Sequence, residues 1–336
     1  MSSSPYTVYL PAGPPGVSWS LPQGVRDTAA LPCVVLADRA GFSEFAVLQR
    51  ALRVVGVPSV RIDAGSAGES RVSGRVPGDV IDVDGRSIVP TVVWVRHFTP
   101  AAIPVGGESW CAWIGQLPAV HLPGGAPGRL TQLAGAARRG VRVPRTIVTT
   151  DPPGAARKLG CERVMVKALG EHFAEVSPGV LEAAFPRIAA PGDLAPADRP
   201  VMVQEYVEHQ EELRVYHLGG ELRAFLVGKP APEAIWRDEA SVTVRLARVP
   251  PDVATAARVL AADWGLRYAA LDFLLTRAGP VFLEANADGD WRWFEARAGC
   301  ESVSLAAASM LRDLHDRSSA LDLTGFLALR TFRGGE

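Results

Sequence analysis

The stretch YAALDFLLTRAGPVFLEAN (268–286) decides the fold, because it reads as two apolar strands joined by a short turn. The turn TRAGP is centred near residue 278, which is also the midpoint between Asp272 and Glu284. A symmetric hairpin therefore places these two carboxylates directly opposite each other. Asn286 follows two residues after Glu284 and is expected to project from the same face.

This pair of acidic residues needs a partner. Like charges directly opposite each other destabilise a sheet, and the neighbours Phe273, Leu274 and Phe282 make the setting apolar. One solution is a hard cation, since an Asp/Glu/Asn oxygen set suits Mg²⁺. The other is an arginine partner, which this chain can readily supply. The residues alone leave both solutions open, and we favour the metal.

The rest of the C-terminal half is also rich in strands. Four further runs have strand character: VMVQEYV (201–207), ELRVYHL (212–218), ELRAFLV (221–227) and VTVRLARV (242–249). The dipeptide Gly219-Gly220 predicts a hairpin between the second and third. Pro251 and Asp252 begin an amphipathic helix that Gly265 ends, and another helix is predicted at 302–315.

The N-terminal half begins with a β-α-β unit, which indicates an α/β fold with a parallel sheet. CVVLAD (33–38) and VPSVRID (57–63) are the strands, and residues 43–55 have helical spacing. No G-x-G-x-x-G follows the first strand, so a dinucleotide site is not expected there. The segments between these elements and the C-terminal strands are predicted as follows: a loop at 64–79, a strand at 91–98, a linker at 104–128, a helix at 129–139, strands at 145–151 and 163–169, and a helix at 179–187.

Several ordered motifs resemble the ATP-grasp superfamily. The spacing of Asp272, Glu284 and Asn286 is similar to its Mg²⁺-binding pattern, and VMVK (164–167) resembles its phosphate-contacting strand. VQEYV (203–207) resembles its adenine-binding segment, and EELRVYHLGGELRAF (211–225) the hairpin that follows.

Within that superfamily the sequence is most similar to graspetide (microviridin-type) peptide ligases, which are related to ribosomal-protein glutamate ligases. Four segments carry this similarity: VVWVRHF (92–98), RLTQLAGAARRGVRVPRTIVTTDP (129–152), IWR (235–237) and EANADGDWRWFE (284–295). The resemblance covers residues 31–315 and implies an ATP-grasp fold preceded by a parallel-sheet domain.

The resemblance also implies roles for particular residues, with ATP and Mg²⁺ as cofactors. Asp272, Glu284 and Asn286 are the expected metal ligands. The expected nucleotide-binding residues are Arg129, Lys167, Gln204, Glu205, Val207 and Glu212, with Glu211 as the alternative to Glu212 for the ribose. Glu205 and Val207 are expected to act through their backbone groups. Arg214 and Arg237 are the expected catalytic residues, since bidentate guanidinium contacts suit a transferring phosphoryl group.

Three positions depart from the family pattern. Gly128 and Arg129 stand where the family has Asn and Lys, although Arg129 still supplies a cation. Ile235 replaces the Asp of a D-W-R motif, and Ala287 replaces the Pro after the metal-binding Asn. The change at Ile235 bears on the substrate side of the site more than on nucleotide binding.

Three functions follow from the resemblance. The first is an ATP-dependent ligase that activates Asp or Glu side chains of a ribosomal precursor peptide as acyl phosphates and closes ω-ester or ω-amide links. The second is a ligase that adds a free amino acid or amine to a peptide or small carboxylate. The third is a degenerate ATP-grasp protein that binds without turnover. The expected partner is a precursor peptide with leader and core, and a homodimer is expected by resemblance.

The chain length predicts about two domains, and the resemblance implies a finer division into four segments. They are an extended or disordered arm at 1–30, a pre-ATP-grasp domain at 31–122, a small nucleotide lobe at 123–200 and a C-terminal lobe at 201–325.

Composition excludes several other classes. A formal net charge of −1 argues against binding to nucleic acid or anionic membranes through bulk charge. No apolar run approaches the ~20 residues of a membrane helix. The N-terminus is unlike a signal peptide, and the four cysteines are far apart, so we expect no zinc cluster or disulfide framework and a cytoplasmic location. Only three of the 35 basic residues are lysines, Lys158, Lys167 and Lys229, which makes each one worth attention.

Overall fold

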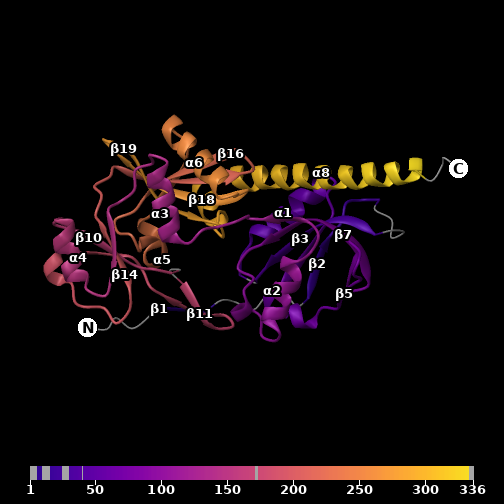
Figure 1. The fold of residues 1–336 in the computed structure, drawn as a ribbon, viewed down its shortest axis with the longest axis horizontal. Helices are drawn as coiled ribbons and strands as arrows, with labels where there is room; N and C mark the ends of the chain where they lie inside the picture. Colours follow the sequence, from indigo (N-terminus) through magenta and orange to yellow (C-terminus); the bar gives the residue numbers. More distant parts are fainter. Residues whose placement is uncertain (1–5, 10–15, 25–29, 40, 171–172, 333–336) are drawn as a thin grey trace. The chain divides into compact units, whose positions relative to one another are not determined.

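The computed structural model describes residues 6–9, 16–24, 30–39, 41–170 and 173–332. The chain forms two compact units (Figure 1). The hairpin unit comprises the residues up to Val8, Gly124–Val176 and Val180–Glu301, and the parallel-sheet unit comprises Tyr9–Pro123, Ser177–Gly179 and the chain from Ser302. Both units combine sheets with helices, as the predicted α/β class requires.

The parallel-sheet unit contains a seven-stranded sheet in the order β2-β4-β3-β7-β6-β5, with β8 paired to β7. Its strands are β2 (Val17–Ser20), β3 (Leu31–Asp38), β4 (Ser59–Asp63), β5 (Val72–Gly74), β6 (Ile81–Val83), β7 (Arg86–Val95) and β8 (Val120–Leu122). β3 is parallel to both β4 and β7, and β7 is parallel to β8. The predicted β-α-β unit with a parallel sheet is therefore confirmed.

Two helices cover this sheet and complete its core. α1 (Glu44–Val54) matches the predicted helix at 43–55, and its apolar face buries Phe45, Leu48 and Leu52 completely. α8 (Ser302–Phe332) packs against α1 and β7 and extends well beyond the predicted 302–315. The Oγ1 of Thr91 on β7 lies 2.8 Å from Nδ1 of His315, which ties α8 to the sheet.

The linker predicted at 104–128 is wrong, because this segment contains α2 (Gly107–Gly115) as well as β8. Glycines stand at both ends of this helix, which begins at Gly107 and ends at Gly115. Gly106 before it has a left-handed φ of 70°. Ile114 is buried, and Trp110 and Trp113 pack against the core of the unit. The loop predicted at 64–79 holds the 3₁₀ helix η1 (Ala64–Glu69) and β5.

The hairpin unit contains three sheets. The five-stranded sheet, in the order β17-β16-β15-β18-β19, comprises β15 (Glu211–Leu218), β16 (Glu221–Gly228), β17 (Thr243–Ala247), β18 (Tyr268–Thr276) and β19 (Gly279–Asn286). The four-stranded sheet, in the order β13-β10-β14-β9, comprises β9 (Thr146–Thr149), β10 (Val164–Ala168), β13 (Arg187–Ala189) and β14 (Val201–Glu205). The third sheet, β1-β12-β11, comprises β1 (Tyr6–Tyr9), β11 (Phe173–Ser177) and β12 (Val180–Ala183).

Helices cover these sheets. α6 (Pro251–Asp263), predicted from Pro251 and Asp252, packs its buried face on the five-stranded sheet. α3 (Arg129–Arg138), also predicted, contacts β19. α4 (Pro152–Leu159) covers β14, and the sequence analysis missed it. The sequence nevertheless contains the residues that begin and end this helix. The Asp151 side chain accepts from Gly154 N at 3.0 Å at its start, and Gly160 ends it with a φ of 64°. The shorter helices are α5 (Ala234–Arg237) and α7 (Arg292–Ala298).

Both hairpins predicted in the C-terminal half are confirmed, but the helix predicted at 179–187 is wrong. β15 and β16 pair around Gly219-Gly220, where both glycines have positive φ, and β18 pairs with β19. The segment predicted as a helix contains β12 and the first residue of β13. Pro186 disfavours a continuous helix there, and the periodicity of a short apolar run does not separate helix from strand.

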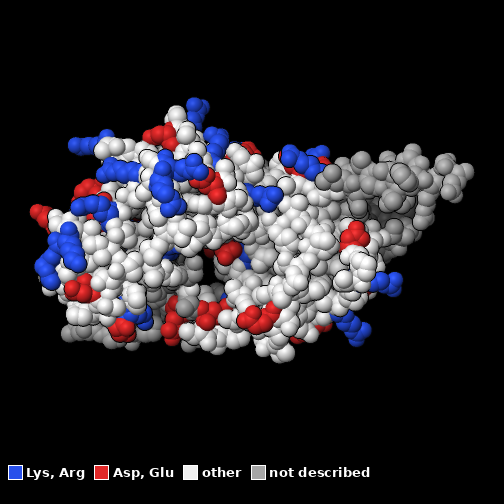
Figure 2. Space-filling model, viewed as in Figure 1, with Lys and Arg blue, Asp and Glu red and all other residues white. Residues whose placement is uncertain are grey.

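Other expectations from the sequence stay predictions. The division into four segments is among them, and residues 1–5, 10–15 and 25–29 of the arm lie outside the described residues. None of the helices that the structure describes has the length and apolar character needed to cross a membrane. Figure 2 shows basic and acidic side chains on the face that it draws, in keeping with a formal net charge of −1.

Candidate functional site

The hairpin β18–β19 places Asp272 directly opposite Glu284, as the sequence predicts, and Asn286 opposite Ala270. The turn that produces this register is not the symmetric turn that the sequence predicts. The tip pairs Thr276 with Gly279, which by itself would bring Asp272 opposite Leu283. An irregularity between Asp272 and Phe273 adds one residue on β19 and restores the carboxylate pair.

Arginines accompany both carboxylates. Nη1 of Arg214 lies 3.1 and 3.0 Å from the two oxygens of Asp272, and Nη2 of Arg129 lies 2.9 Å from Oε2 of Glu284. Arg129 begins α3 and also donates to the carbonyls of Ala168 and Gly170 at 3.1 and 2.8 Å. It therefore links the end of β10 to the β18–β19 hairpin. The arginine partners that the sequence allowed for these carboxylates are therefore present. Binding of a metal ion by the same carboxylates stays a prediction.

Lys167 lies on β10 opposite Met202, on the sheet face turned away from the apolar contact with α4. Gln204 is two residues from Met202 and shares this face. Its amide is buried and donates to the Thr146 hydroxyl at 2.9 Å. Arg129 contacts both Ala168 at the end of β10 and Glu284 on β19, so the two sheets turn these faces toward one another. The charges of Glu284 and Glu212 accordingly act on Lys167.

Lys229 is a functional candidate that the sequence analysis noticed only as a rare lysine. It follows β16, and its Nζ lies 2.9 Å from Oε2 of Glu212. His209 approaches the other oxygen of Glu212 at 3.6 Å. Glu211, the alternative ribose ligand, pairs instead with Arg245. Since neighbouring strand residues face opposite sides, only Glu212 shares the face of Arg214 and Asp272.

Burial and mutual charge shift the pKa values of this site. Burial lowers the pKa of Lys167, and Arg129 and Lys229 add to the effect while Glu284 and Glu212 oppose it. Burial raises the pKa of Asp272 to about 6, with Glu284 reinforcing the shift and Arg214 opposing it. Four cations thus surround three carboxylates, and the excess positive charge suits a polyphosphate anion.

Burial alone would raise the pKa of Glu212, but the hydrogen bond with His209 and the charge of Lys229 outweigh it, and the pKa is lowered. The same hydrogen bond raises the pKa of His209. Glu212 is therefore held as a carboxylate, which is the form that accepts hydrogen bonds from hydroxyl groups.

The donor set fits Mg²⁺ bound together with nucleotide phosphates. Two carboxylates and one amide oxygen are hard ligands, and Mg²⁺ is often held by one or two carboxylates plus substrate phosphates. No group of three or more His, Cys, Asp or Glu suited to a metal occurs in the described part of the chain. Asn286 also accepts from the Asp288 backbone N–H at 2.9 Å, which orients its amide.

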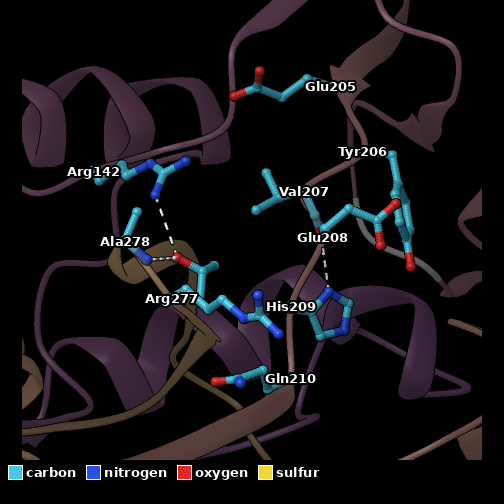
Figure 3. Close-up of a pocket in the computed structure, with 10 residues that line it drawn as sticks. Arg142, Glu205, Tyr206, Val207, Glu208, His209, Gln210, Arg277 and Ala278 are labelled. Atoms are coloured by element: carbon cyan, nitrogen blue, oxygen red, sulfur yellow. Dashed lines mark hydrogen bonds between the residues drawn. The ribbon is translucent and has the colours of Figure 1, made fainter.

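A pocket of about 570 Å³ lies where β14 leads into β15. Figure 3 shows the chain from Glu205 to Gln210 along one side, with Arg142, Arg277 and Ala278 on the other. Thr276, which lines this pocket, is on the same face of β18 as Asp272, so the pocket continues the charged face.

Hydrogen bonds engage the backbone of Glu205 and Val207, which line the pocket where adenine is predicted to bind. Arg145 O accepts from Glu205 N at 3.0 Å, and the Glu205 side chain accepts from the Arg145 side chain. The carbonyl of Val207 lies 2.8 Å from Nδ1 of His209. The side chain of Glu205 is thus engaged by Arg145, which agrees with a role through its backbone.

Arg237, a predicted catalytic residue, is not brought into this cluster. It is exposed at the end of α5, and among the described residues no ion pair joins it to an acidic side chain. Its neighbour Trp236 stacks on Phe185 with ring centroids 5.2 Å apart. Among the other predicted residues, Arg129 lies at the start of α3, and the rest lie on the two facing sheets or at the pocket.

Solved structures share this architecture. The chain is similar to the macrocyclase MdnC of Microcystis aeruginosa bound with precursor peptide MdnA, with a TM-score of 0.68 and 19% identity over 84% of this chain and 99% of the other. The chain has the ATP-grasp fold. A Chryseobacterium gregarium RiPP-associated ATP-grasp ligase, in complex with ADP and a leader and core peptide, matches with a TM-score of 0.67 and 18% identity over 84% of this chain and 96% of that one.

The chain is also similar to a Vibrio cholerae D-alanyl-alanine synthetase A, with a TM-score of 0.55 and 13% identity over 87% of this chain and 99% of that one. No protein-family model and no curated protein matches the sequence. These likenesses confirm the ATP-grasp fold that the motifs predicted, with its parallel-sheet N-terminal part.

Proposed function

We propose that the chain is an ATP-dependent ligase that acts on a ribosomal precursor peptide. It would activate Asp or Glu side chains as acyl phosphates and form ω-ester or ω-amide links. The observation that carries the proposal is the cluster of Lys167, Lys229, Arg129 and Arg214 around the Asp272–Glu284 pair. A cytoplasmic location and a homodimer belong to the same proposal.

Different residues would bind the adenine, the ribose and the phosphates of ATP. The backbone around Glu205 and Val207 would hold adenine, and the ionised Glu212 would accept from the ribose hydroxyls. Lys167 on β10 and Arg129 at the start of α3 would contact the phosphates. Mg²⁺ held by Asp272, Glu284 and Asn286 would neutralise charge on the β- and γ-phosphates when bound. Phosphoryl transfer depends mainly on such positioning and charge neutralisation.

The chemistry has two steps. A carboxylate oxygen of the peptide attacks the γ-phosphorus, the bond from this phosphorus to the bridging oxygen of ADP breaks, and ADP leaves. A peptide hydroxyl or amine then attacks the acyl carbon, inorganic phosphate leaves, and the nucleophile loses its proton. Arg214, held by Asp272 and Tyr216, would contact the oxygens of the transferring phosphoryl group.

The peptide substrate is supported by the solved structures with this fold. MdnC is bound with its precursor peptide, and the Chryseobacterium ligase with ADP and a leader and core peptide. The alternative function is ligation of a free amino acid or amine. The similarity to a D-alanyl-alanine synthetase favours this second candidate.

The first test is nucleotide binding. Calorimetry with ADP, with and without Mg²⁺, compares the wild type with the double variant Asp272→Asn/Glu284→Gln. Mg²⁺-dependent binding that collapses in the double variant is expected. A wild type that binds no nucleotide, alone or with a precursor peptide present, would contradict the ligase and favour the degenerate protein.

The second test identifies the bond formed. The protein is incubated with ATP, Mg²⁺ and a short peptide encoded beside its gene, and the product is weighed by mass spectrometry. A peptide lighter by one water for each link supports macrocyclisation. A peptide heavier by an added residue supports the alternative ligase.

A further inference from the structure

Gln132 makes a contact that neither the motifs nor the proposed reaction accounts for. Its side-chain Oε1 accepts from Ala285 N at 2.8 Å, and its Nε2 donates to Ala285 O at 2.9 Å. The same Nε2 donates to Pro127 O at 2.9 Å. Gln132 is only 6% exposed. This buried amide is thus satisfied by backbone groups, and two of its three hydrogen bonds go to one residue, Ala285.

That residue lies between two of the predicted metal ligands. Ala285 separates Glu284 from Asn286 on β19, and its side chain packs in the core on the opposite side of the sheet. Because side chains alternate along a strand, the orientation of the Ala285 peptide groups sets the directions of both neighbours. A side chain that holds these groups therefore controls the spacing of a carboxylate and an amide oxygen.

β19 needs such support. It is the last strand of its sheet, so its outer backbone groups have no strand partner in the described part of the chain. The extra residue at Leu283 also breaks the regular ladder immediately before Glu284. Phe282 N donates to Arg142 O at 2.8 Å on one side of this irregularity, and Gln132 holds Ala285 on the other. The amide of Gln132 thus takes the place of a neighbouring strand's peptide group.

The same helix face approaches Glu284 a second time. Arg129 is three residues before Gln132 on α3, so the two side chains share a face. Arg129 contacts the Glu284 carboxylate, and Gln132 contacts the backbone that follows it. The geometry points to α3 as the support of the metal-binding hairpin, and we propose that Gln132 is a positioning residue for Glu284 and Asn286. This inference rests on the proposed function.

The test is the Mg²⁺ dependence of ADP binding in the full-length variant Gln132→Met, measured by calorimetry. The side chain keeps its length and loses its hydrogen bonds. We expect the affinity for Mg²⁺ in the ADP complex to fall about 10- to 100-fold, the usual effect of losing a partner that orients metal ligands. The affinity for ADP without Mg²⁺ is expected to stay unchanged, which a general loss of structure would not allow.

The parallel-sheet unit offers a matched control. Gln49 on α1 is also 6% exposed, and its Nε2 donates to Ser18 O on the edge strand β2 at 2.9 Å. Gln49→Met should leave the Mg²⁺ dependence as in the wild type. If Gln132→Met folds poorly, Gln132→Asn keeps a polar amide that is too short to span both Ala285 groups. It should show the same selective loss.

Two results would overturn the inference alone. One is a wild-type Mg²⁺ affinity in both Gln132 variants, and the other is an equal loss of ADP affinity with and without Mg²⁺. If the ADP affinity of the wild-type protein is the same with and without Mg²⁺, the proposed function is overturned, and the inference with it.

Discussion

Arg214 and Asp272 face each other across β15 and β18, and Nη1 of Arg214 lies within 3.1 Å of both carboxylate oxygens. The Nε of the same guanidinium donates to the Tyr216 hydroxyl at 2.9 Å. Its plane also lies over Phe294, 4.8 Å from the ring centroid. Burial works against the cation, but the charge of Asp272 and the interaction with Tyr216 outweigh it and raise the pKa of Arg214. The site therefore holds a permanent positive charge in one orientation.

Replacing this arginine with lysine should separate charge from geometry. Arg214→Lys keeps the positive charge but cannot reach Asp272 and Tyr216 together with a planar fork. We expect ADP formation with a peptide substrate to slow by about 10²–10³-fold, since one preorganised donor typically contributes this much. Calorimetry should show ADP binding retained. The control is Arg245→Lys, an exposed arginine of the same five-stranded sheet. Equal rates for both variants would exclude a role for Arg214 in the transfer.

Lys229 should contribute to nucleotide affinity through Glu212. In Lys229→Met the carboxylate loses its charge-assisted partner at 2.9 Å, and the cluster loses one of its four cations. We expect ATP affinity to fall about 10- to 100-fold, since a hydrogen bond to a charged group contributes about 1.5–3 kcal/mol. The KM for ATP measures this effect. Lys158→Met, on the exposed side of α4, is the control and should match the wild type. An unchanged KM in Lys229→Met would remove Lys229 from the site.

The sequence predicted the parts of this site that depend on local pattern. Strand alternation and turn residues were enough to place Asp272 opposite Glu284, although the true turn is one residue tighter and a bulge compensates. The prediction that Asp272 lies opposite Glu284 was correct because both residues belong to the same short hairpin. Its internal pairing is set by a few neighbouring residues rather than by distant packing.

Contacts between distant segments escaped the sequence analysis. Gln132 and Ala285 are 153 positions apart, and nothing in either local pattern indicates their hydrogen bonds. Lys229 became a candidate only when β16 placed it beside Glu212. The helix α2 was missed because its flanking glycines resemble a linker, whereas tertiary burial of Ile114 decides its structure.

The parallel-sheet unit should become less stable as pH rises, because of Asp38. This residue at the end of β3 is fully buried, and burial raises its pKa to about 7, with Arg96 and His97 opposing the shift. Between about pH 4 and 7 the folded state holds a proton that the unfolded state has released. Stability is therefore lost as pH rises through this window, by up to about 1.4 kcal/mol per pH unit.

Denaturant unfolding between pH 4 and 8 would measure this slope. Asp38→Asn cannot ionise, so its unfolding free energy should vary less with pH than that of the wild type. The exposed Asp79→Asn serves as the control and should keep the wild-type slope. Parallel pH profiles for the wild type and Asp38→Asn would show that Asp38 does not titrate in this range.

Gly289 should tolerate no side chain, because it lies where the chain after Asn286 passes Arg214. An added Cβ would lie 2.4 Å from the Cβ of Ala270 and 3.0 Å from Nη2 of Arg214. Ala270 is fully buried on β18 and pairs with Asn286, so it cannot move away without shifting that strand. The carbonyl of Gly289 also accepts from the Tyr268 hydroxyl, which holds the loop against the sheet.

We therefore expect Gly289→Ala to lose about 1–3 kcal/mol of stability, the usual effect of overpacking. Its ADP formation rate should fall as well, since relief of the clash must displace either the hairpin or Arg214. Gly192→Ala is the matched control, because a Cβ at Gly192 meets no atom within 4 Å. Thermal unfolding and turnover measured on the same preparations separate the two effects. If Gly289→Ala unfolds like the wild type and reacts at the same rate, the close approach of this loop to Arg214 does not constrain the site.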